Sequence, residues 1–171
     1  TVCLPYFSTK FFRLRSPMRA APTAASMLLA GVVMKLGAYG CLRVAVGLLP
    51  AGAQDWAPWV AVVAVINIVY GALVALKQDD FKYVIGYSSV SHMGFVLVGV
   101  YAFDAIAMQG AVMQMVAHGF STAALFMMAG AIQHRIHTRD MTQMGGLWQA
   151  MPKMGAVALF FIVASLGMPG L

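Results

Sequence analysis

The sequence contains no glutamate, and its acidic residues are five aspartates. Charged residues occupy only 9% of its 171 positions, whereas roughly a quarter of the residues of a soluble domain are charged. So few charges cannot cover the surface of a soluble domain. Together with the 61% of hydrophobic residues, this scarcity indicates a membrane protein.

Other common features are also missing. The two cysteines, Cys3 and Cys41, lie far apart without metal-ligand spacing, so they indicate neither a metal site nor a redox compartment. No signal peptide is recognisable, because the N-terminus lacks a basic stretch followed by a small-residue cleavage site. The sequence begins at Thr1 and stops at Leu171 inside an apolar run, so we expect it to be an internal piece of a longer protein.

Long apolar runs are abundant, and the mean hydropathy is +0.82. A helix needs about 20 apolar residues to cross the hydrocarbon of a bilayer. The sequence therefore predicts an all-α, polytopic transmembrane helix bundle of about five spans, the last of them cut at a helix break. Frequent glycines inside the runs suit close helix packing in lipid. The predicted spans are 22–49, 57–76, 83–101, 106–132 and 154–171.

The distribution of basic residues predicts the orientation of the spans. The connections that follow the second and fourth spans carry lysine and arginine, whereas the connections around Asp55 and Asp104 carry neither. By the positive-inside rule, residues 77–82 and 133–153 lie in the cytoplasm, and the chain is a multi-pass membrane protein. The basic residues behind the net charge of +6 therefore serve to orient the spans in the membrane, and no nucleic-acid partner is predicted.

Three ionisable side chains, Lys35, His92 and His118, fall near the middle of separate predicted spans. A charge at mid-membrane costs from about 3 to more than 10 kcal/mol, so such groups are usually functional. Burial disfavours the charged ammonium, and histidine titrates near neutrality. We therefore predict that these three residues form a proton relay. The alternative for Lys35 is a structural pairing with a backbone carbonyl or a partner subunit, and for the histidines a satisfied place in the core.

Polar neighbours are expected to support this relay. Three serines lie beside His92, which predicts hydrogen-bond partners or water at that depth. Gln114 and Thr122 lie one helical turn before and after His118, so all three share one helix face. The predicted supporting residues are Ser88, Ser89, Ser91, Gln114, Thr122 and Lys82.

Two charged clusters are predicted to be ordinary surface features. Residues 79–82, which include Lys82, have the composition of a solvated turn between spans. Residues 133–140 are predicted to form a surface loop. His134 and His137 in that loop lack a nearby third ligand, so no metal site is predicted.

Three motifs in this sequence resemble the antiporter-like subunits of respiratory complex I, the NADH:quinone oxidoreductase. They are APTAASMLLAGVVMKLGAYG at 21–40, DFKYVIGYSSVSHMG at 80–94, and HTRDM at 137–141 followed by MGGLW at 144–148. The last motif is most similar to the M-type subunit. The resemblance covers residues 21–171 and implies a fragment from about the eighth to the twelfth of some fourteen helices.

The resemblance implies that Lys35 is the central element of a proton path and that His92 and His118 belong to the same hydrated axis. It implies a translocase subunit without a redox site or cofactor of its own, because the flavin, iron–sulfur clusters and quinone are expected in other subunits. The implied partners are the other membrane subunits of complex I, including neighbouring antiporter-like subunits, and lipid. Residues 167–170 are similar to the start of a discontinuous helix, which is tolerated at depth only beside a cavity.

Some features leave alternatives open. Residues 1–20 depart from the family pattern, and we interpret them as an atypical stretch that arises from a frame or annotation error. A subunit of a multisubunit sodium/proton antiporter, or of a related membrane-bound hydrogenase, shares the same helix bundle. A cytochrome with His92 and His118 as haem ligands and a purely structural membrane scaffold are more distant alternatives.

Overall fold

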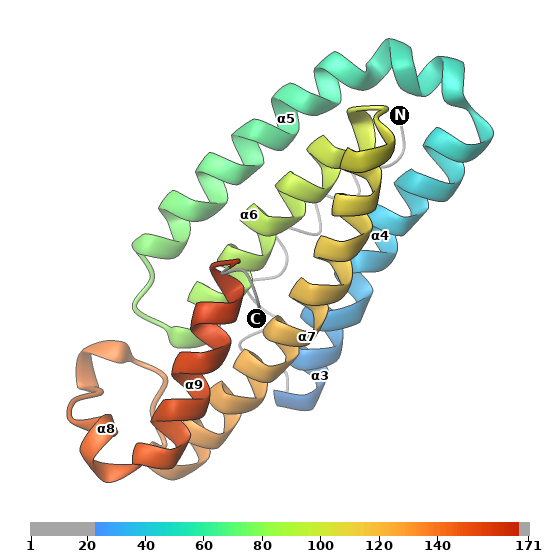
Figure 1. Ribbon diagram of the computed structural model, residues 1–171. Coiled ribbons are helices and arrows are strands. Elements are labelled where there is room, and N and C mark those ends of the chain that lie inside the picture. The colour runs from blue at the N-terminus through green and yellow to red at the C-terminus, as the bar shows by residue number, and fades with distance from the viewer. Residues whose placement is uncertain (1–22, 168–171) are drawn as a thin grey trace.

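The computed structural model describes residues 23–167, and all regular elements in that range are helices (Figure 1). Four helical stretches are long and apolar enough to cross a membrane, and a fifth, shorter apolar helix follows them. This confirms the prediction of an all-α transmembrane bundle. The four long stretches are Thr23–Val46, Pro50–Leu76 (α5), Phe81–Tyr101 (α6) and Ala105–Ile136 (α7), and the shorter helix is Pro152–Ser165 (α9).

The first long stretch changes its helix type along its length. It consists of α3 (Thr23–Leu28), a π-helical segment (Leu29–Val33), α4 (Met34–Gly40) and a second π-helical segment (Cys41–Val46). A π-helical turn is wider than an α-helical one, and such turns are frequent at functional sites. The first π segment lies directly before Lys35.

Helix bounds differ from the sequence-based expectation at two connections. Residues 50–56, expected to connect the first and second spans, instead form the start of α5, because proline suits a first helical turn, where its missing N–H is not needed. The non-helical residue is Leu49. At the other end of the bundle α7 continues to Ile136, so residues 133–136 are helical rather than part of a surface loop. His137 ends the helix in a left-handed conformation with φ 59°.

The long helices run up and down beside one another, with α6 between α5 and α7 (Figure 1). α3 packs along α7, and α9 packs on α7 as well. Two short elements, Met141–Gln143 and α8 (Leu147–Ala150), lie in the connection between α7 and α9. The atypical stretch 1–20 lies outside the described residues, as does most of the expected helix break. Gly167, at the start of that break, follows α9 with φ 76°.

Two glycines allow α5 and α6 to pack with their backbones in close contact. A Cβ atom on Gly94 of α6 would lie 2.9 Å from the carbonyl oxygen of Ala64 on α5. A Cβ on Gly71 of α5 would lie 3.0 Å from the backbone nitrogen of Ser91 on α6. Both contacts are with backbone, which cannot swing aside, so the helix spacing depends on these residues.

We therefore expect Gly94→Ala to push α5 away from α6 and to destabilise the bundle by about 1–3 kcal/mol, the usual cost of overpacking. Thermal unfolding of the full-length subunit in detergent measures this effect. Gly52→Ala is the matched control, because a Cβ there meets nothing within 4 Å. Equal midpoints for the two variants would contradict the packing argument.

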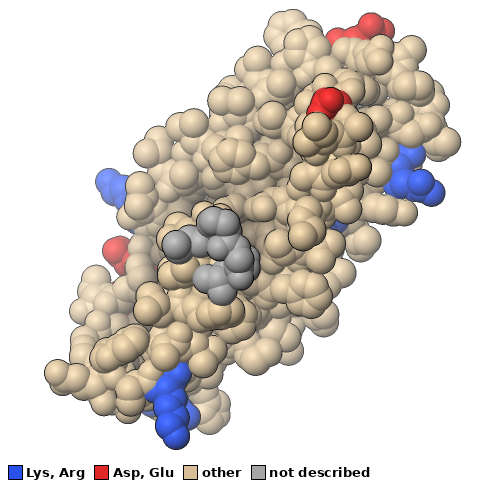
Figure 2. All heavy atoms as spheres, in the orientation of Figure 1, with Lys and Arg blue, Asp and Glu red and all other residues tan. Residues whose placement is uncertain are grey.

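Apart from the buried Lys35, most charged groups lie toward the ends of the bundle. Figure 2 shows charged side chains toward the ends and edges of the molecule and a broad uncharged surface between them. The connection before α6 and the connection after α7 meet at one end, where Phe81 N donates to Arg139 O at 3.2 Å and Met141 N donates to Asp79 O at 2.9 Å. Arg139 and Asp80 add an ion pair at 3.9 Å. The two connections richest in basic residues thus share one side of the bundle.

Three of the five aspartates cap helices at these ends. Asp80 accepts a hydrogen bond from Lys82 N, and Asp104 accepts from Ile106 N and Ala107 N. Asp140 accepts from Thr142 at both its hydroxyl and its backbone N–H, and these bonds hold the pKa of the Asp140 carboxyl below its usual range. Carboxylates are thereby used at helix N-termini, where the helix dipole favours them.

Candidate functional site

The candidate site begins with Lys35, which is only 9% exposed. Its Nζ donates a 2.5 Å hydrogen bond to the carbonyl oxygen of Ala30, five residues earlier in the π-helical segment. Helical side chains lean toward the N-terminus of their helix, so the ammonium is directed back toward α3. Within residues 23–167 the one ion pair closer than 4.0 Å is Arg139–Asp80, so Lys35 has a dipole partner there rather than a carboxylate.

Small residues bring the Lys35 helix against α7. A Cβ on Gly119 would lie 3.2 Å from the carbonyl oxygen of Gly31, and a Cβ on Gly31 would lie 3.5 Å from Ala123 Cβ. Gly31 is in the π segment just before Lys35, and Gly119 directly follows His118. The close approach of these two backbones sets Lys35 and His118 at the same depth of the bundle.

His92 of α6 and His118 of α7 are in direct contact. Their ring centroids are 4.6 Å apart and their planes are inclined by 31°. His118 is 5% exposed, while His92 is partly buried. Lys35 belongs to the helix that packs against α7 at Gly119, the residue after His118. Positive charges on neighbouring groups oppose one another, so simultaneous protonation of all three is disfavoured.

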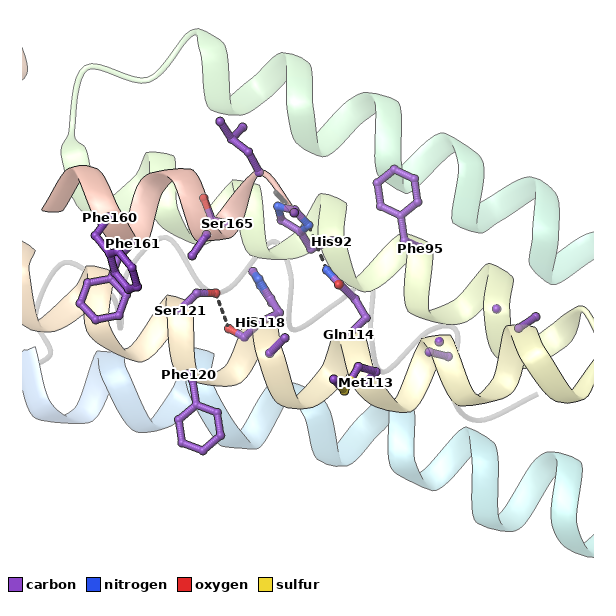
Figure 3. A pocket seen from close by; sticks show the side chains of 18 residues that line it. His92, Phe95, Met113, Gln114, His118, Phe120, Ser121, Phe160, Phe161 and Ser165 are labelled. Atoms are coloured by element: carbon purple, nitrogen blue, oxygen red, sulfur yellow. Dashed lines mark hydrogen bonds between the residues drawn. The ribbon is translucent and has the colours of Figure 1, made fainter. Parts of the chain in front are cut away.

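Each imidazole has a polar partner. The Thr122 hydroxyl lies 3.1 Å from Nε2 and 3.3 Å from Nδ1 of His118, so it contacts the edge of that ring. Gln114 Nε2 lies 3.4 Å from His92 Nδ1 (Figure 3). The predicted pairing of Thr122 with His118 along one helix face is thus present, but Gln114 reaches across to α6 instead.

The two imidazoles border a cavity of about 840 Å³ between α6, α7 and the C-terminal part of α9. Gln114, Ser121 and Ser165 add polar groups to its lining, and Figure 3 shows the rings of His92 and His118 directed toward one another at its wall. Water requires roughly 30 Å³ per molecule and two to four polar partners. The cavity meets both requirements and adjoins the helix end at Gly167.

Two of the serines beside His92 bond to backbone carbonyls, whereas the sequence predicted that they would be hydrogen-bond partners of His92. Ser89 donates to Ile85 O of its own helix at 2.9 Å, and Ser91 donates to Ile68 O of α5 at 3.0 Å. Ser88 is only partly buried. Ser89 and Ser91 therefore hold backbone carbonyls rather than the imidazole of His92.

Lys82 also departs from expectation, because it is 3% exposed and not part of a solvated turn. The first turn of α6 carries it into the bundle, where its Nζ lies 3.4 Å from Thr23 Oγ1 of α3. Sequence reasoning missed two buried polar groups. Ser121 is 9% exposed and lines the cavity. The other, Ser26, is 1% exposed. A search for polar residues on the helix face that precedes Lys35 would have found it.

The geometry also bears on the alternatives. The rings of His92 and His118 contact each other, so no porphyrin plane fits between them as it would between two axial ligands. Among the residues that the structure describes, no three His, Cys, Asp or Glu side chains lie close enough together to hold a metal ion. The arrangement is suited to moving protons between neighbouring bases.

Comparison with known proteins places this arrangement in context. Residues 14–171 match the family model described as NADH:quinone oxidoreductase/Mrp antiporter, transmembrane. NADH-quinone oxidoreductase subunit M of Pseudomonas aeruginosa is 51% identical over 150 residues, and that of Escherichia coli K12 is 53% identical over 150 residues. Each alignment covers 88% of this chain and 30% of the relative, so the chain spans less than a third of the length of these relatives.

A solved structure is similar as well. Respiratory complex I from Thermus thermophilus with bound NADH contains a chain that matches with a TM-score of 0.78 and 32% sequence identity. The match covers 81% of the present chain and 30% of that one.

Proposed function

The chain belongs to the NADH:quinone oxidoreductase/Mrp antiporter transmembrane family, and from this premise we propose that it forms part of an M-type subunit that moves protons across a membrane. The observation that carries the proposal is the contact between the rings of His92 and His118 beside a buried Lys35. A scaffold has no need of three ionisable groups at one depth of a bilayer.

The proposed mechanism uses the mutual repulsion of these groups. A proton held on Lys35 moves through water and hydroxyl groups to His118 and His92 when a positive charge approaches Lys35 from a neighbouring unit. A unit charge 8 Å away changes the energy of such a group by about 2 kcal/mol at an effective dielectric constant near 20. A change of this size reverses the protonation preference of a base that is poised near neutrality.

We further propose that redox chemistry elsewhere in the assembly supplies this charge. In this account the flavin, iron–sulfur clusters and quinone belong to other subunits, and this chain acts as a non-redox part of a translocase. Its partners are other membrane subunits, among them neighbouring antiporter-like ones, together with lipid. Residues 77–82 and 133–153 face the cytoplasm of a bacterial cell, which the meeting of the two basic connections at one end supports.

A second candidate, a subunit of a multisubunit sodium/proton antiporter, is favoured by the other half of the family description. The names of the relatives at 51% and 53% identity support the oxidoreductase instead. Neighbouring genes discriminate between the two, because genes for iron–sulfur and quinone-site subunits accompany only the oxidoreductase.

A chimera tests the proposal directly. Residues 21–171 of this chain replace the aligned segment of the Escherichia coli subunit, and proton uptake driven by NADH is measured in inverted membrane vesicles. The proposal predicts uptake comparable to that of the parent subunit, because the relay residues are transferred together with their helices. An assembled chimera that oxidises NADH without proton uptake would contradict it, and the unmodified parent subunit is the control.

A further inference from the structure

A second line of polar groups lies outside the histidine cavity, between α3, α6 and α7. It starts at Lys82, which is 3% exposed and whose Nζ contacts Thr23 Oγ1 at 3.4 Å. Thr23 packs against Gly130 of α7, where any Cβ would clash with it. Lys82 is thus held inside the bundle, beside the ion pair of Asp80 and Arg139 where the basic connections meet.

The line continues one turn further along α3 at Ser26. Ser26 is 1% exposed, and its hydroxyl is the one buried side-chain N or O atom without a hydrogen-bond partner in residues 23–167. A buried hydroxyl without a partner costs about 1–3 kcal/mol, and such a group usually marks a place for a bound water. Helical geometry sets Thr23, Ser26 and Ala30 along one face, and Ala30 O is the acceptor of Lys35 Nζ.

Apolar side chains fill the space between α6 and α7 at this depth. Ala30, Ile85, Phe126 and Ala129 form a buried hydrophobic cluster, and Phe126 is fully buried. Along α7, Phe126 lies between Thr122 at the histidine site and Gly130 beside Thr23. Ser26 therefore provides the polar group between Lys82 and Lys35 at this depth.

We propose that Lys82, Thr23 and Ser26 form the proton-uptake path that supplies Lys35 from the end of the bundle where the two basic connections meet. The inference rests on the proposed function and names the side from which the relay is loaded. The Lys82 ammonium gives one proton to a water beside Thr23 and regains one from the aqueous phase. Each hydroxyl or water accepts one proton and passes one on, and neutral Lys35 binds the last, so no charge is created or lost.

Variants at Lys82 test the path in the complete complex reconstituted into lipid vesicles. Lys82→Gln and Lys82→Arg are both expected to lower NADH-driven proton uptake by about 100-fold, the lower end of the range for a lost proton-transfer group. Arginine keeps the charge beside Asp80 but does not release its proton. Restoration of uptake by Lys82→Arg would mean a structural role and would overturn the inference. Lys77→Gln is the control, because Lys77 is an exposed lysine near the same end.

Ser26→Ala is the sharper test. It removes one oxygen that makes no hydrogen bond in the described structure, so folding and assembly are expected to be unaffected or improved. The path nevertheless predicts slower proton uptake, by about tenfold. Normal uptake in Ser26→Ala or in both Lys82 variants, with uptake lost in Lys35→Ala, would remove this inference and leave the proposed function in place. Normal uptake in Lys35→Ala would remove both.

Discussion

Lys35→Ala is expected to abolish most proton translocation while the complex still assembles and oxidises NADH. In the proposed path Lys35 joins the two lines of polar groups, because its Nζ donates to Ala30 O on one side and its helix packs against α7 beside His118 on the other. Within the described residues Lys35 forms no ion pair, so its removal leaves no carboxylate without a partner. We therefore expect little loss of folding stability.

The measurement is the number of protons taken up per NADH oxidised in vesicles, with assembly checked on native gels. Lys35→Arg separates charge from proton transfer, because arginine stays protonated. It is expected to fail like alanine. Lys153→Ala is the control, since Lys153 is an exposed lysine at the start of α9. Normal stoichiometry in either Lys35 variant would show that Lys35 is a packing residue.

His118→Phe is expected to reduce proton uptake by about 100-fold, the lower end of the range for losing an acid–base group. Phenylalanine preserves the ring that contacts His92 at 4.6 Å but can neither bind a proton nor contact Thr122 by hydrogen bonding. His134→Phe is the matched control, because His134 is exposed at the end of α7 and outside the cavity.

A double-mutant cycle with His92→Phe gives the second part of this test. Two groups in one path lose their function together, so the double variant is expected to be little worse than the worse single variant. Fully additive losses would mean that the two histidines act in separate processes. Unchanged uptake in both single variants would mean that the rings are satisfied core residues.

The sequence predicted what hydropathy and isolated charges determine. Apolar runs gave the four long spans to within a few residues at most ends, because the cost of exposing polar backbone to lipid restricts such runs to helices. Lys35, His92 and His118 stood out for the same reason, since an ionisable group in an apolar run is costly and rare. The structure brings the rings of His92 and His118 into contact and buries Lys35 on the neighbouring helix, whereas the relay between the three groups stays a prediction.

What the sequence could not predict depends on which helix faces meet. The sequence around Lys82 predicts a polar turn, yet Lys82 is only 3% exposed and contacts Thr23 of α3. Gln114 has the spacing of a partner for His118, but its Nε2 lies 3.4 Å from Nδ1 of His92 on α6. The π-helical segment before Lys35 was not predicted; it contains Gly31, which lies against Gly119 of α7.

The most direct test of the account is a structure of the whole complex at a resolution that shows ordered water in this chain. We predict water and hydroxyl oxygens spaced about 3 Å apart, a normal hydrogen-bond length, from Lys35 Nζ to the facing imidazoles of His92 and His118. Dry side-chain packing between the lysine and both rings, or a Lys35 ammonium turned toward lipid, would contradict it.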